Sequence, residues 1–133
     1  MIVLDTHVLL WMDRDDPALG KETRALITKA WRTAGVSVSA ISFWESAMLA
    51  QRERIRLPCT ASMWRADLLE SGLTELPLDG RIAVLACELE NLHRDPADRF
   101  IAASALHHSA TLITADEKLL AWQHSLARID ART

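Results

Sequence analysis

The sequence predicts an α/β fold, with helices on both faces of a mainly parallel central sheet in three α/β/α layers. Short apolar runs of strand length alternate along the chain with segments whose apolar residues repeat at helical spacing. A chain of 133 residues is long enough for one domain with its own core and too short for two ordinary ones, so we expect a single domain over residues 1–133. Half of the residues are hydrophobic and a quarter are charged, as in folded globular proteins.

The N-terminal half begins with a predicted strand that stops at an acid. Residues 1–4 form a continuous apolar run, which is typical of a strand buried on both faces, and Asp5 follows it. Residues 36–41 alternate in polarity and are rich in β-branched side chains, which predicts the second strand. Ser42 as an N-cap and Glu45 three residues later have the spacing of a capping box. The helices predicted in this half cover residues 8–12, 23–31, 42–54 and 61–71.

The C-terminal half continues the alternation of helix and strand. Residues 82–92 carry the clearest amphipathic stripe in the chain and predict a helix. A loop is expected over residues 93–97, because Pro96 disfavours helix at the residue before it. Residues 111–114 predict a buried strand that leads to Asp116. The remaining predictions are an extended segment over residues 73–78, helices over residues 98–108 and 117–123, and an edge strand over residues 127–129.

Four acidic side chains are the candidate functional residues. In a parallel α/β sheet, ligands bind beyond the carboxyl ends of the strands, and Asp5 and Asp116 are placed there. The predicted fold brings Glu45 and Asp98 toward the same edge. Each acid alone also has an ordinary explanation. Asp5 and Asp116 can cap the helices that follow them, Asp98 can interact with a helix dipole, and Glu45 can complete the capping box.

The four acids together indicate a metal site. Carboxylates packed side by side without cations repel one another and destabilise the fold. Oxygen ligands, with no histidine or cysteine spacing for zinc, favour Mg²⁺ or Mn²⁺, and such ions activate water for phosphodiester cleavage. We therefore predict that Asp5, Asp98 and Asp116 bind metal directly, and that Glu45 holds a metal-bound water or orients the attacking water.

Three nearby residues are predicted to support this site or to have local structural roles. Thr114, two residues before Asp116, has a hydroxyl suited to orienting a metal ligand, and Thr6 is a weaker case of the same kind. Asp95 is an additional acid near the site. Both a capping role before Pro96 and a contact with metal stay open for it.

Four segments, spaced in order across the whole chain, carry a resemblance to a known family. They are LDTHVLLW at residues 4–11, SAISFWE at 39–45, DPADRFIAA at 95–103 and LITAD at 112–116. With these segments the sequence resembles the PIN-domain ribonucleases, and specifically the VapC-type toxins of type II toxin-antitoxin systems.

The resemblance implies a function and a set of functional residues. It places the family's acids on Asp5, Glu45, Asp98 and Asp116, and it implies Mg²⁺ or Mn²⁺ and endonucleolytic cleavage of RNA. It also implies a homodimer and a cognate antitoxin that blocks the site. Arg99 matches the arginine of the family's Asp-Arg pair, for which a structural role or a substrate role is expected.

Charge and composition bear on the partners and the compartment. A net charge of −3 argues against a nucleic-acid partner, but cations bound by the acids would neutralise much of it. Arg52, Arg54 and Arg56 form a basic run whose simplest explanation is a solvated helix end. No apolar run approaches a membrane span, no leader precedes Asp5, and Cys59 and Cys87 are isolated, so we expect a cytoplasmic protein without a membrane partner.

Two other classes of function stay open from the residues. One is a catalytically silent interaction module, in which the acids serve only folding and partner binding. The other is a phospho-accepting receiver domain, which also gathers acids at strand ends but needs a phosphorylatable Asp at the end of a central strand. The sequence has no G-x-S-x-G elbow and no glycine-rich phosphate loop, which disfavours serine hydrolases and nucleotide-binding proteins.

Overall fold

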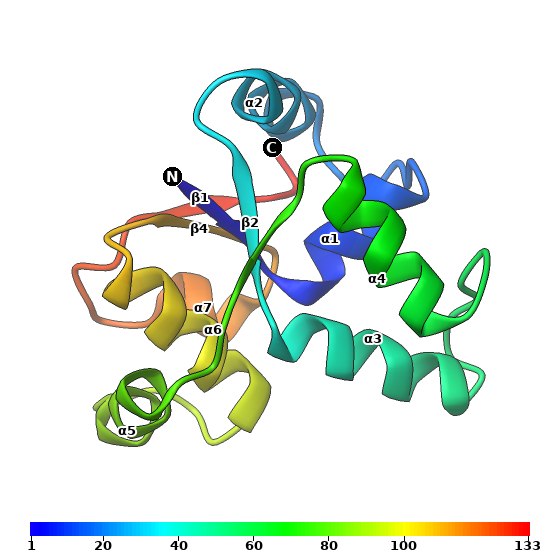
Figure 1. Cartoon of the computed structure of the whole chain (residues 1–133). Helices are drawn as coiled ribbons and strands as arrows, with labels where there is room; N and C mark the ends of the chain where they lie inside the picture. The colour runs from blue at the N-terminus through cyan, green and yellow to red at the C-terminus, as the bar shows by residue number, and fades with distance from the viewer.

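The computed structural model describes residues 1–133 and contains one five-stranded sheet in the order β3-β2-β1-β4-β5 (Figure 1). Every pair of neighbouring strands is parallel. The strands are β1 (Ile2–Leu4), β2 (Val36–Ser39), β3 (Thr74–Leu76), β4 (Thr111–Thr114) and β5 (Arg128–Asp130). The prediction of a parallel central sheet is confirmed, and the last strand lies at an edge as expected.

Helices cover both faces of this sheet. The helices are α1 (Thr6–Asp13), α2 (Lys21–Arg32), α3 (Ile41–Gln51), α4 (Ala61–Glu70), α5 (Gly80–Glu88), α6 (Pro96–His107) and α7 (Glu117–Ala121). In Figure 1, α1 to α4 lie on one side of the strands and α5 to α7 on the other. None of these helices is both long enough and apolar enough to cross a membrane. The predicted three-layer α/β/α fold is confirmed.

Alternating strand residues build a separate core on each face of the sheet. Leu4 and Ile113 belong to a buried cluster that includes residues of α1, α2 and α4. Val3 and Leu112, their neighbours in the strands, belong to a second cluster with residues of α6 and α7. All four side chains are fully buried, which agrees with the apolar residues that predicted β1 and β4.

The strand order reverses direction between β1 and β4. From β1 the chain adds β2 and β3 on one side of the sheet, and then crosses to add β4 and β5 on the other. Such a switch point opens a crevice beyond the carboxyl ends of the two central strands. Receiver domains instead carry their third strand beside the first, whereas β3 here is an edge strand, so the sheet order argues against the receiver hypothesis.

The start of α6 differs from the prediction. The helix begins at Pro96 and not at Asp98, so Pro96 and Ala97 are helical where a loop was expected. Asp95 is the N-cap, and its Oδ1 accepts a hydrogen bond from the Asp98 amide at 3.3 Å. The first helical position suits proline, because that residue has no intrahelical partner for an amide hydrogen. The capping role considered for Asp95 is confirmed.

The capping box predicted at Ser42 is wrong. Strand β2 ends at Ser39 and α3 begins at Ile41, so Ser42 lies inside the helix and is buried. The hydroxyl of Ser39 instead accepts a hydrogen bond from the Ile41 amide at 3.2 Å. The helix also stops at Gln51, before the Arg-rich segment. Glu45 therefore does not cap α3, and its side chain is available for another contact.

Helix α5 ends four residues before its predicted limit at residue 92. Its C-cap is Leu89, which has an extended backbone with φ −61° and ψ 125°. The carbonyl groups of Ala86 and Cys87, which would accept from the amides of residues 90 and 91 in a longer helix, instead accept hydrogen bonds from the Arg99 guanidinium at 2.8 and 3.2 Å. A side chain from α6 thus replaces the helical hydrogen bonds that the apolar stripe alone would predict.

Candidate active site

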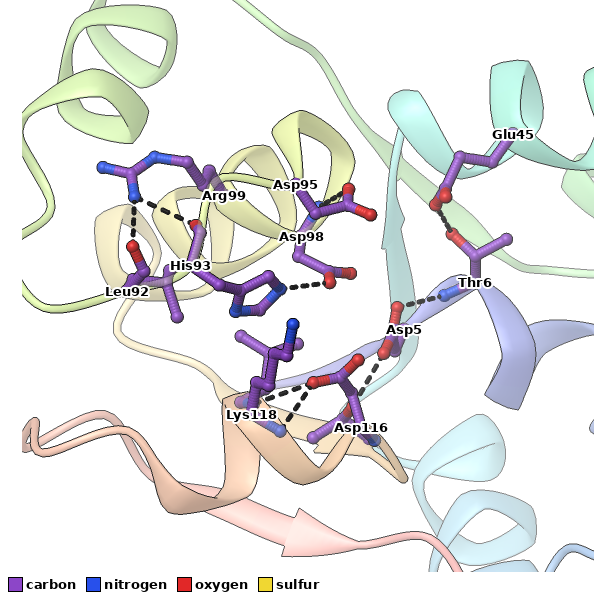
Figure 2. A network of polar contacts seen from close by, with 12 residues as sticks. Asp5, Thr6, Glu45, Leu92, His93, Asp95, Asp98, Arg99, Asp116 and Lys118 are labelled. Carbon is purple, nitrogen blue, oxygen red and sulfur yellow. Dashed lines mark hydrogen bonds and ion pairs between the residues drawn. The ribbon is translucent and has the colours of Figure 1, made fainter.

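The predicted acids converge beyond the carboxyl ends of β1 and β4 (Figure 2). Asp5 follows β1, Asp116 follows β4, Asp98 lies in the first turn of α6, and Glu45 lies on α3. Asp5, Asp98 and Asp116 face a common space in Figure 2, and Glu45 lies beyond Thr6. The convergence expected from the strand order is therefore present, although the acids come from four different elements.

Asp5 is a buried carboxylate held by two hydrogen bonds. Its Oδ1 accepts from the Thr6 amide at 2.7 Å, which caps α1, and its Oδ2 accepts from the Thr114 hydroxyl at 2.7 Å. The side chain is only 5% exposed. Burial raises the pKa of Asp5, and the two hydrogen bonds oppose that rise. Asp5 thus caps α1 as expected, but the cap uses only one lone pair of Oδ1.

Asp116 is tied to Asp5 through the hydroxyl of Thr114. The Asp116 amide donates to Thr114 Oγ1 at 3.0 Å, while the same hydroxyl donates to Asp5. Asp116 Oδ1 accepts from the amides of Lys118 and Leu119, both at 2.9 Å, and so caps α7. One fully buried threonine therefore fixes the relative positions of two predicted ligands, in the supporting position expected for it.

Asp98 is a largely buried acid whose pKa is raised to about 7. Burial is the largest cause, the negative charges of Asp5, Asp95 and Asp116 contribute to the rise, and the hydrogen bond with His93 opposes it. Its Oδ2 lies 2.6 Å from Nε2 of His93, a residue of the loop between α5 and α6. His93, Asp98 and Asp116 each offer a ligand atom, and these atoms all lie within 4.8 Å of one another.

His93 is the residue of this site that the sequence prediction missed. It falls in a predicted loop five positions before Asp98, and the sequence contains no partner motif for it. A histidine just ahead of the Asp-Pro N-cap was the available signal. The contact depends on the path of that loop, which sequence periodicity does not describe.

Glu45 stands apart from the other three acids. One carboxylate oxygen contacts the Thr6 hydroxyl, which is also hydrogen-bonded to Ser42 Oγ at 2.9 Å. Burial raises the pKa of Glu45, and the charges of Asp5 and Asp95 raise it further. Thr6 therefore supports Glu45 through its side chain and Asp5 through its amide.

Arg99 holds the loop that carries His93. Its guanidinium donates hydrogen bonds to five backbone carbonyls, which belong to Ala86, Cys87, Leu89, Leu92 and His93. All five acceptors lie between α5 and the start of α6 or at the end of α5. The guanidinium binds backbone carbonyls and points away from the acids (Figure 2). Of the structural role and the substrate role expected for Arg99, these contacts support the structural one.

We expect Arg99→Ala to lower the free energy of unfolding by about 3 kcal/mol, because a charged donor to several carbonyls is lost at once. Arg99→Lys should recover only part of this, since an ammonium cannot reproduce the planar fork. Urea denaturation followed by circular dichroism measures the change. Arg81→Ala, which removes an exposed arginine of α5, is the control and should change stability little. Equal stability of both alanine variants would contradict this structural role.

The residues present fit a divalent cation. Most of the candidate ligand atoms are carboxylate oxygens, which divalent cations such as Mg²⁺ prefer. Asp98 and Asp116 are both half-buried and lie close to one another. Four mutually repelling carboxylates gathered at one sheet edge are the environment in which a hard cation lowers the electrostatic energy. A cavity of about 630 Å³ opens on His93, Asp98 and Asp116 and is also lined by Arg94, Asp95 and Lys118.

The family model described as "PIN domain" matches residues 2–123. The chain belongs to the PIN domain family. The protein named Ribonuclease VapC22 from Mycobacterium tuberculosis is 34% identical to it over 124 residues, which are 92% of each chain. The resemblance stated from the four sequence segments is thus confirmed.

Solved structures share this PIN fold. A toxin-antitoxin complex from Klebsiella pneumoniae superposes with a TM-score of 0.68 at 18% identity, covering 98% of both chains. VapBC2 from Rickettsia felis, bound to a DNA fragment from its promoter, superposes with a TM-score of 0.70 at 16% identity, covering 97% of this chain and 98% of that one. At these identities the likeness establishes the fold.

Proposed function

We propose that this PIN domain protein is a metal-dependent endoribonuclease and the toxin of a toxin-antitoxin pair. The observation that carries the proposal is the convergence of Asp5, Asp98 and Asp116 at the switch point between β1 and β4. Its relative at 34% identity is named a ribonuclease, which supports the same activity. That residues 1–133 form a single PIN domain is part of the proposal.

In this proposal Asp5, Asp98 and Asp116 hold Mg²⁺ or Mn²⁺. A divalent cation bound there lowers the pKa of a coordinated water and stabilises negative charge on the phosphodiester. Asp5 is fixed in advance by Thr6 and Thr114, so its carboxylate does not reorganise when substrate arrives. Arg94 and Lys118, which line the same cavity, are cations placed to contact RNA phosphates beside the acids.

Glu45 is proposed to orient the attacking water. Its Oε1 is engaged by the Thr6 hydroxyl, which leaves Oε2 to accept the proton of that water. The raised pKa of Glu45 suits a group that takes up a proton during the reaction. Glu45 lies beyond Thr6 from the other three acids, which favours this role over that of a direct ligand (Figure 2).

The partners are proposed from the relatives. A cognate antitoxin that covers the acids, a homodimer of this chain, an RNA substrate and a cytoplasmic location complete the proposal. Structural neighbours that are toxin-antitoxin complexes support the antitoxin.

The test is cleavage of RNA by the purified protein freed of antitoxin. With Mn²⁺ or Mg²⁺ we expect internal cuts in total cellular RNA, and EDTA should abolish them. Sequencing the new RNA ends gives the cut site, and ends that are absent with Asp98→Asn protein purified in the same way belong to this protein and not to a contaminating nuclease. A folded protein that binds Mn²⁺ and cuts no RNA would instead support the silent interaction module.

A further inference from the structure

The contact between His93 and Asp98 is shielded from solvent on both sides. Nε2 of His93 lies 2.6 Å from Asp98 Oδ2, and the two side chains are only 16% and 14% exposed. Nothing in the proposed reaction uses this histidine. Yet it is the closest neighbour of a carboxylate that the proposed function assigns to the metal.

The other ring nitrogen of His93 fixes which atom carries the proton. Nδ1 is buried and has no hydrogen-bond partner. A proton on Nδ1 would bury an unpaired donor, which costs more free energy than an unpaired acceptor lone pair at this position. We therefore assign the proton to Nε2, which donates it to Asp98.

The same atom argues against direct metal binding by His93. A histidine that ligates metal through one ring nitrogen almost always donates the other N–H to a carboxylate, a carbonyl or water. Nδ1 of His93 has no acceptor for such a bond. The ring is therefore placed beside the ligand atoms of Asp98 and Asp116 without the support that a ligand needs.

Arg99 sets the position of the ring. It follows Asp98 on α6, and its guanidinium donates to the carbonyl groups of Leu92 and His93 at 2.9 and 3.1 Å. Two neighbouring residues of α6 thus hold His93: Asp98 contacts its ring, and Arg99 binds its carbonyl group (Figure 2). These two contacts leave the ring little freedom to move away from Asp98.

We propose that His93 is a positioning residue for Asp98. By donating its Nε2 hydrogen to Oδ2, it holds the carboxylate in one orientation and leaves Oδ1 as the oxygen offered to the divalent cation. The inference rests on the proposed function, in which Asp98 is a metal ligand. His93 acts through Asp98 and touches neither metal nor RNA.

Two substitutions at His93 separate the effect of its hydrogen-bond donor from the effect of the ring's volume. His93→Phe fills the space and removes the donor, whereas His93→Gln places an amide N–H at about the distance of Nε2. We expect His93→Phe to weaken Mn²⁺ binding about 10- to 100-fold, measured by calorimetry and by the electron paramagnetic resonance of free Mn²⁺. His93→Gln should recover most of the affinity. His107→Phe, an exposed histidine of α6, is the matched control and should bind Mn²⁺ as the wild type does.

Further measurements separate positioning from ligation and from a general fold defect. Pulsed electron resonance of the wild type with Mn²⁺ should show no coupling to a histidine nitrogen, and such a coupling would overturn the positioning role. In an Asp98→Asn background, His93→Phe should cause no further loss of Mn²⁺ affinity, and an equal additional loss would also overturn it. The first measurement uses the wild type alone, so it tests the positioning role even if His93→Phe folds poorly.

The outcomes for the inference and for the proposed function are distinct. If the wild type binds Mn²⁺ and cuts RNA while His93→Phe binds Mn²⁺ equally well, the inference alone is wrong. If the wild type fails to bind Mn²⁺, the proposed metal dependence is wrong, and the inference that rests on it is wrong too.

Discussion

Asp98→Asn should reduce the rate of RNA cleavage by about a thousandfold or more at saturating Mn²⁺. Burial and the charges of Asp5, Asp95 and Asp116 disfavour the ionised form of Asp98, and a bound cation would offset both effects. An amide keeps the shape but removes the negative charge, and losing several kcal/mol of charge stabilisation in the transition state corresponds to this factor. Single-turnover cleavage of a labelled RNA measures the rate.

The matched control for that substitution is Asp95→Asn, the same chemical change three residues earlier. Asp95 is exposed and caps α6, and asparagine is as good an N-cap as aspartate. Cleavage should therefore fall by less than about tenfold and the helix should persist. A loss as large as that of Asp98→Asn would place Asp95 among the metal ligands, the alternative left open from the sequence. An active Asp98→Asn protein would contradict the assigned role of Asp98.

The parts of the fold that the sequence predicted are those fixed by local pattern. Residues 1–4 form a continuous apolar run, and the run 111–114 places Leu112 and Ile113 between two threonines. The structure fully buries Val3, Leu4, Leu112 and Ile113 on the two faces of the sheet. Because each run is followed by an acid, the strand prediction also located Asp5 and Asp116 at the same edge. The parallel pairing of β1 with β4 then makes the two acids neighbours.

The errors occur where a tertiary contact overrides a local rule. Ser42 and Glu45 have capping-box spacing, but the Thr6 hydroxyl on α1 contacts the Glu45 carboxylate instead. The stripe over residues 82–92 predicts one long helix, but Arg99 binds the carbonyls of Ala86 and Cys87, which the last turn of that helix would use. Neither partner is near in sequence, so periodicity and caps alone could not predict these outcomes.

The sequence prediction placed Asp98 near Asp5 and Asp116, but it did not include the contact that Asp98 makes with His93. The position of Asp98 in the first turn of α6 follows from the Asp-Pro start of the helix, which the sequence shows. Its contact with His93 follows from a loop whose path is set by Arg99, and no pattern in the sequence encodes that path. The sequence therefore predicted which carboxylates gather, and the structure added what orients one of them.

Without divalent cations, the free energy of unfolding should fall by on the order of 3 kcal/mol as the pH rises from about 4.5 to about 8. The folded protein raises the pKa of Asp98 from 3.8 to about 7, so between these values the folded state binds a proton that the unfolded state has lost. The stabilisation is complete below the unfolded pKa and disappears as the pH passes the folded one. Asp5 and Glu45, whose pKa values are also raised by burial, act in the same direction. Urea titrations at several pH values in EDTA measure the fall.

Two comparisons assign this pH dependence to the acid site. Asp98→Asn in EDTA should be more stable than the wild type at pH 8 and should lose much of the slope, because the group that titrates is gone. Glu75 and Asp130 have lowered pKa values, so they change charge at lower pH. They cannot make the free energy of unfolding fall as the pH rises to 8. Saturating Mn²⁺ should remove the slope in the wild type, since cation binding to the ionised carboxylates replaces the proton and adds stability that grows as the pH rises. A wild-type protein whose stability in EDTA rises from pH 5 to pH 8 would show that its carboxylates are not held in the repulsive arrangement on which the proposed metal site depends.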